Sequence, residues 1–107
     1  MADFIYSSEG RPQGFRLSSH IFAIDGTPLG RVFAEKVYSF AGDYVGMLLN
    51  NMILDKPDVS RRRLPPATAP ARAQGFGGGE TRRPVCEVFP DAFPTLLRAG
   101  EAAEGRP

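Results

Sequence analysis

The sequence predicts an all-β protein, an antiparallel meander of 16-residue hairpin repeats with a short C-terminal helix. Three stretches of ten residues align at a spacing of 16, and they begin at Ile5, Ile21 and Val37. Each stretch has an aromatic-rich segment, a turn that contains glycine and a second apolar segment, which is the pattern of a β-hairpin. Because such units must stack on their neighbours, the repeat predicts the architecture, but it does not predict the chemistry.

Each turn contains a glycine that we interpret as a structural turn residue. Glycine adopts positive φ without steric cost, and an acidic residue followed by glycine is a strong hairpin signal. Glu9 and Asp25 precede two of the turns at equivalent positions, so we interpret them as turn formers and not as an acid/base pair. The three turn glycines are Gly10, Gly26 and Gly42.

Two registers are possible for the hairpins. A two-residue turn would pair Tyr6 with Gln13, whereas a three-residue turn with a glycine bulge pairs Tyr6 with Pro12. We favour the second register because it brings aromatic and aliphatic residues together across nearly every hairpin. Its other expected pairs are Phe22–Pro28, Tyr38–Tyr44, Ile5–Gln13, Ile21–Leu29 and Val37–Val45.

The second strand of each hairpin contains another glycine, which marks close approach of a ring or a neighbouring strand. These glycines are Gly14, Gly30 and Gly46. The third repeat is expected to be apolar on both faces, with Val37, Val45, Met47 and Leu49 on one and Tyr38, Phe40, Tyr44 and Leu48 on the other. Both faces then need cover, either from the C-terminal segment or from a second copy of the protein.

The composition divides the 107 residues into four segments of one domain. Residues 1–55 hold the repeats, and a fourth start falls in phase at Ile53. Residues 56–84 are a Pro/Arg/Gly-rich insertion that we expect to be disordered. Residues 85–100 supply a strand at 85–89 and a helix over 92–99, which Asp91 caps and Gly100 ends. Residues 101–107 form a disordered tail.

Candidate catalytic groups are few, so we expect no enzyme, cofactor or metal. His20 is the single histidine, and it falls in a turn between hairpins, where an exposed turn residue is the simpler interpretation. Cys86 is the single cysteine, which excludes an internal disulfide framework and fits a buried apolar position. The absence of a signal pattern and of a long apolar stretch predicts a cytoplasmic protein with no membrane contact, and the composition suggests a bacterial source.

Two kinds of partner follow from the sequence. A small core beneath a sheet that is apolar on both faces predicts self-association as a cyclic homo-oligomer, with a tetramer favoured. The alternative function is a module that binds nucleic acid or another polyanion through the insertion, where seven basic residues face two acidic ones. The candidate phosphate contacts are Arg61, Arg62, Arg63, Arg82 and Arg83.

The repeat pattern of an aromatic residue, an acidic residue with glycine and a further glycine resembles small bacterial proteins described as four-fold β-flower proteins. The stretches that carry this resemblance run from Ile5 to about Asp55, with a possible last strand at 85–89. The resemblance implies a fold of hairpin repeats and a four-fold assembly. It implies no catalytic or binding residues.

Overall fold

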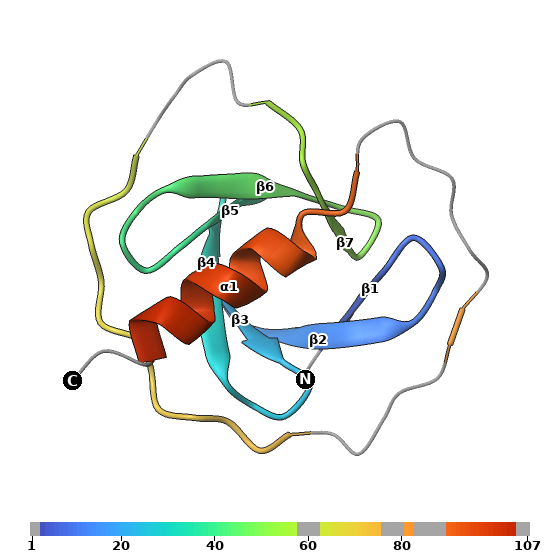
Figure 1. Cartoon of the computed structure of the whole chain (residues 1–107), viewed down its shortest axis with the longest axis horizontal. Helices are drawn as coiled ribbons and strands as arrows, with labels where there is room; N and C mark the ends of the chain where they lie inside the picture. The colour runs from blue at the N-terminus through green and yellow to red at the C-terminus, as the bar shows by residue number, and fades with distance from the viewer. Residues whose placement is uncertain (1–2, 58–62, 76–80, 83–89, 105–107) are drawn as a thin grey trace.

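The computed structural model describes residues 3–57, 63–75, 81–82 and 90–104, and in 100–104 only the backbone. One antiparallel sheet contains seven strands that follow one another in sequence order, and one helix follows (Figure 1). This arrangement confirms the predicted fold class. The elements are β1 (Asp3–Tyr6), β2 (Pro12–Leu17), β3 (His20–Ala23), β4 (Pro28–Phe33), β5 (Lys36–Tyr38), β6 (Tyr44–Leu49), β7 (Met52–Leu54) and α1 (Phe93–Glu104).

The sheet curls until its first and last strands meet, so it is nearly barrel-shaped. The Tyr6 backbone N–H donates to the Asn51 carbonyl oxygen at 2.8 Å, and Asn51 Nδ2 donates to the Phe4 carbonyl oxygen at 3.2 Å. These bonds join β1 to the turn between β6 and β7. They satisfy backbone groups that an open sheet would leave exposed at its edge.

A fourth, shorter unit follows the three hairpins in the curled sheet. β7 lies in phase with β1, β3 and β5, and the returning chain pairs with it through a bridge between Leu54 and Asp91. The Ala92 N–H donates to the Ile53 carbonyl oxygen at 2.8 Å. Three hairpins and this shorter pair therefore form one curled sheet within a single chain, and α1 lies against it (Figure 1). The predicted strand at 85–89 lies outside the described residues.

The hairpin register is partly as predicted. Tyr6 pairs with Pro12, Phe22 with Pro28 and Tyr38 with Tyr44, which confirms those three expected pairs. The next expected pairs are wrong by one residue, because a bulge follows at once in every hairpin. Ile5 pairs with Gly14 instead of Gln13, Ile21 with Gly30 instead of Leu29, and Val37 with Gly46 instead of Val45.

The bulge also changes which face each side chain occupies, since a shift of one residue turns a side chain to the other face. Leu48 packs against the core that contains Val37, so its expected place on the opposite face is wrong. At the hairpin tips, the backbone φ angles are 86° at Gly10, 95° at Gly26 and 102° at Gly42. Residues with a Cβ rarely adopt this conformation.

The glycines of the second strands form the seat of α1. A Cβ on Gly14 would lie 2.8 Å from the Phe93 ring, one on Gly30 would lie 2.7 Å from Leu96 Cδ1, and one on Gly46 would lie 3.1 Å from Ala92 Cβ. The expected close approach is thus made by the helix, and also by carbonyl oxygens of neighbouring strands. Ala92, Phe93 and Leu96 are buried there among aliphatic residues from all four units: Ile5, Ile21, Val37 and Ile53.

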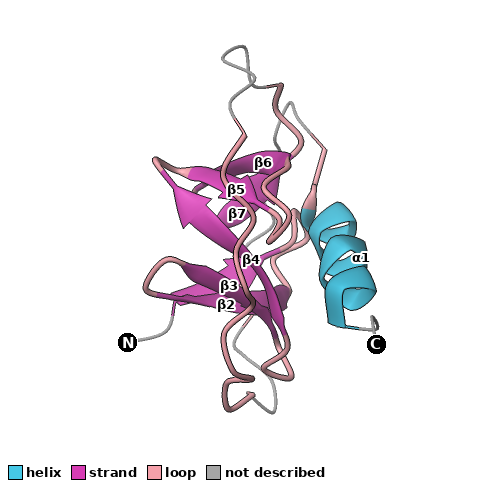
Figure 2. Ribbon diagram, turned by 90° about the vertical axis from the view of Figure 1, so that its left-hand side faces the viewer, coloured by secondary structure: helices cyan, strands magenta, loops and turns pink. Residues whose placement is uncertain are grey.

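The helix begins at Phe93, one residue after the predicted start at Ala92, and ends later than predicted. Asp91 Oδ1 accepts a hydrogen bond from the Phe93 N–H at 3.0 Å, which caps the first turn. The expected end at Gly100 is wrong, because α1 continues to Glu104. α1 therefore covers the inner face of the sheet with residues of the same chain, and this face needs no second copy (Figure 2).

Candidate functional site

A pocket lies on the inner side of the sheet, two residues along each strand from the seat of α1. Side chains alternate along a strand, so Arg16 and Leu48 face the same way as Gly14 and Gly46. The strands then run on into the turns between hairpins, on the side of the sheet away from α1 (Figure 2). The first and last strands meet here, so β1, β2, β6 and the turn after β6 all contribute residues.

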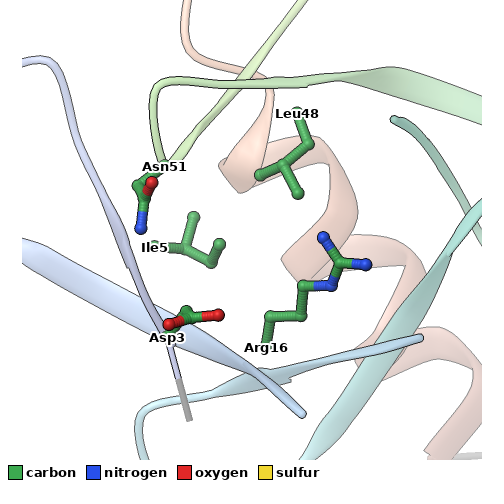
Figure 3. A pocket seen from close by; sticks show the side chains of 5 residues that line it. All are labelled: Asp3, Ile5, Arg16, Leu48 and Asn51. Atoms are coloured by element: carbon green, nitrogen blue, oxygen red, sulfur yellow. The ribbon is translucent and has the colours of Figure 1, made fainter. Parts of the chain in front are cut away.

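The pocket is small, about 60 Å³ in volume. Ile5, only 1% exposed, and Leu48 supply apolar wall, while Arg16, Asp3 and Asn51 supply polar groups (Figure 3). Proteins bind drug-sized ligands in sites of roughly 300–1,000 Å³. The pocket therefore fits only a few water-sized groups or one small molecule.

The polar groups of the pocket fall into donors and acceptors. Arg16 Nε donates to the Ser18 carbonyl oxygen at 2.7 Å, and this bond leaves the two terminal nitrogens of the guanidinium as further donors at the edge of the pocket (Figure 3). Asn51 donates its Nδ2 to the Phe4 carbonyl oxygen, so its Oδ1 remains as an acceptor. The Asp3 carboxylate belongs to the residue directly opposite Arg16 in the β1–β2 register. These charged and polar groups can bind a small polar ligand.

None of these pocket residues was predicted from the sequence to have a functional role. A signal existed in the repeat itself, because Arg16 occupies the position that Val32 and Leu48 hold in the next two repeats. A charged residue at an aliphatic repeat position indicates a local role other than packing. The pocket also needs Asn51 on the same side as β1, and the hydrogen bond of Asn51 to the Phe4 carbonyl oxygen depends on the closure of the sheet.

The arginines proposed for polyanion binding do not form one cluster in the part of the chain that the structure describes. Arg63 pairs with Asp43 at 2.7 Å, at the tip of the β5–β6 hairpin. Arg82 lies 4.5 Å above the centre of the Tyr6 ring and donates Nη2 to the Asn50 carbonyl oxygen at 2.8 Å, beside the first hairpin. Arg61, Arg62 and Arg83 lie outside the described residues.

The described residues of the insertion follow the hairpin tips around the molecule, and we call residues 63–75 and 81–82 the strap (Figure 1). The strap donates one backbone N–H to each turn glycine. Leu64 donates to the Gly42 carbonyl oxygen at 3.1 Å, Ala73 to that of Gly26 at 2.9 Å and Arg82 to that of Gly10 at 2.9 Å. The three donors follow one another at intervals of nine residues, so the strap contacts each successive hairpin tip after the same length of chain.

Charge reinforces the strap at the second hairpin. The Thr27 backbone N–H donates to Asp25 Oδ1 at 3.0 Å, and Arg72 pairs with Asp25 Oδ2 at 3.1 Å. The hydrogen bonds from Thr27, followed by the Arg72 charge, hold the pKa of the Asp25 carboxyl below its usual value. Asp25 therefore forms the turn, as expected, and also holds the strap.

Two further candidates from the sequence can be placed. His20 is the first residue of β3 and is half-buried, with its ring centroid 6.5 Å from that of Phe22 and 6.4 Å from that of Phe40. Its expected exposure in a turn is wrong, because the turn is shorter and aromatic neighbours cover the ring. Cys86 lies outside the described residues. Within the described ranges, His, Cys, Asp and Glu form no group of three that could hold a metal ion.

The fold is that of a small, mostly β protein, in which hairpin units form a nearly barrel-shaped antiparallel meander with one C-terminal helix. The family model of the 4-fold beta flower protein matches residues 3–60, more than half of the chain, and the chain belongs to this family. No curated protein and no solved structure gave a match. Among the described residues, no helix is long and apolar enough to cross a membrane.

Proposed function

We propose that this protein is a non-enzymatic, self-associating β-repeat protein that associates through the side of its sheet away from α1. The observation that carries the proposal is the exposure of Phe33 and Leu49, which are 49% and 46% exposed. They end β4 and β6 at equivalent positions of the repeat, and half-buried Leu17 ends β2 in the same way. Large apolar residues that recur on one side of a protein are typical of an interaction surface.

The proposed assembly is smaller than the sequence suggested. The tetramer was expected because the sheet needed cover on both faces, but α1 covers the inner face within the chain. The face that carries Tyr38 and Phe40 is also buried within the chain, and the large apolar residues that stay exposed are Phe33 and Leu49. So small an apolar surface can bury itself against a copy most simply in a two-fold dimer, the commonest symmetric assembly. The dimer therefore replaces the tetramer as the favoured proposal, and the four-fold description of the family fits the units inside one chain.

The alternative, a module that binds nucleic acid or another polyanion, has less support. Arg63, Arg72 and Arg82 each have a partner within the chain, and the carboxylates of Asp43 and Asp25 offset the charge that Arg63 and Arg72 could offer to a phosphate. The arginines also sit at different hairpin tips, whereas a phosphate backbone needs a continuous basic path.

The proposal is tested with the double variant Phe33→Ser/Leu49→Ser. We expect the wild type to elute and sediment as an oligomer and the double variant as a monomer with an unchanged circular dichroism spectrum. The matched control is Phe33→Leu, which keeps an apolar side chain and should keep the assembly. An oligomer that persists unchanged in the double variant would rule out this surface.

A further inference from the structure

We propose that the pocket binds a small zwitterion that carries one carboxylate and one ammonium group, such as a free α-amino acid with a short side chain. The pocket contains none of the residues on which the proposed self-association rests, so the two proposals are argued separately. It rests on the residue types that line the pocket, on their hydrogen bonds and on the internal repeat.

The repeat supplies an internal comparison for Arg16. Val32 and Leu48, at the same position of the next two repeats, pack on the core, so an aliphatic residue serves the fold at this place. Arg16 is half-buried, and burying part of a guanidinium costs free energy that packing alone does not return. Its bond to the Ser18 carbonyl oxygen uses Nε and leaves the terminal nitrogens as a donor pair. Such a planar donor pair matches the two oxygens of a carboxylate.

The opposite side of the pocket offers acceptors. Asp3 contributes a carboxylate, and Asn51 contributes its Oδ1. A purely anionic ligand would meet repulsion from Asp3, and a purely cationic one would meet repulsion from Arg16. A ligand with both charges satisfies both sides, and the apolar wall from Ile5 and Leu48 strengthens these interactions by excluding water from one side.

The size of the pocket sets the class of zwitterion. A volume of about 60 Å³ admits the charged end of an amino acid but no large side chain. A ligand with so few atoms binds weakly, and we expect a dissociation constant on the order of 1 mM.

The experiment is a titration of the isotope-labelled full chain with glycine, followed by the amide signals of residues around the pocket. Acetate and methylammonium, each carrying one of the two charges, are titrated separately at the same ionic strength. We expect saturable shifts at Arg16, Leu48 and Asn51 with glycine, and binding at least roughly tenfold weaker with either half alone. Absence of saturable shifts, or acetate binding as tight as glycine, would overturn the proposal.

Two variants assign the binding to the pocket. Arg16→Leu restores the residue type of the third repeat, so it should fold, and it should lose glycine binding. Asp3→Asn changes an exposed residue at the start of β1 and should weaken glycine binding while strengthening acetate binding, because it removes the repulsion from Asp3. The matched control is Arg11→Leu, an exposed arginine at a hairpin tip, which should bind as the wild type does. Unchanged glycine binding in both Arg16→Leu and Asp3→Asn would refute the assignment.

Discussion

Replacing Gly26 by asparagine tests whether the strap holds the hairpin tips. Asparagine tolerates positive φ better than other residues with a Cβ, so it adds less backbone strain at the φ of 95° than any other substitution, and this strain is the same whether or not the strap is present. Its Cβ, however, would lie 1.9 Å from the Ala73 carbonyl oxygen. The strap would have to retreat by about 1 Å or more to restore van der Waals contact.

This retreat breaks two interactions whose magnitudes can be estimated. The hydrogen bond from the Ala73 N–H to the Gly26 carbonyl oxygen, 2.9 Å long, contributes about 1 kcal/mol to folding. The exposed ion pair between Arg72 and Asp25 contributes roughly 0.2–1 kcal/mol. Gly26→Asn should therefore lower the unfolding free energy by about 1–2 kcal/mol, which corresponds to a melting temperature roughly 4–16 °C lower.

The assay is thermal unfolding followed by circular dichroism, in a double-mutant cycle. The second change replaces residues 63–75 by a Gly/Ser linker of equal length. If the strap contacts the tip, Gly26→Asn should cost at least about twice as much in the natural chain as in the replaced one, because interacting sites are not additive. Equal costs in both backgrounds would refute the reasoning and would support the disordered insertion expected from the sequence. Arg72→Ala, which removes only the ion pair, should cost at most about 1 kcal/mol.

Three further predictions follow from the structure. Gly30→Ala places a Cβ 2.7 Å from Leu96 Cδ1 and should lower the unfolding free energy in urea by about 1–3 kcal/mol; an unchanged midpoint would contradict the seat of α1. The pKa of the Asp25 carboxyl is lower in the folded protein than the value of about 3.9 in the unfolded chain, so this carboxylate stabilises the fold above that pH. The stabilisation is lost as the pH falls through the folded pKa. Asp25→Asn should therefore lose less stability than the wild type on acidification below about pH 4. Fluorescence anisotropy with labelled DNA should show only weak binding at low salt and none at physiological salt; tight binding there would instead favour the polyanion alternative.

Much of the fold could be predicted because the same local pattern of aromatic residue, turn and glycine occurs in each of the three repeats. The turn glycines, the aromatic pairs such as Tyr38–Tyr44 and the C-terminal helix all follow from local patterns. The register beyond the first pair could not be predicted, because a bulge depends on how the strand meets its neighbours. The only sequence sign of the bulge was the glycine in each second strand. We interpreted that glycine only as a sign that a ring or a neighbouring strand lies close to it. Because the prediction did not include the extra residue of the bulge, it placed Leu48 on the wrong face of the sheet.

The candidate site was less accessible from the sequence, because it depends on contacts between distant segments. Asn51 reaches β1 only when the sheet closes, and no local sequence pattern predicts how strongly a meander will curl. The strap is an intermediate case. Arg63 and Arg72 are nine residues apart and meet Asp43 and Asp25, but such pairings between a loop and two turns have no local signature. The division of the chain into domains stays a prediction.

The measurement that tests the proposed function most directly is the molar mass of the intact protein in solution. Light scattering coupled to gel filtration should be carried out over a range of micromolar concentrations. A mass of twice the 11.6 kDa chain is expected, and it should fall toward the monomer on dilution if the interface is the small apolar side around Phe33 and Leu49. A mass of one chain at every concentration would contradict self-association.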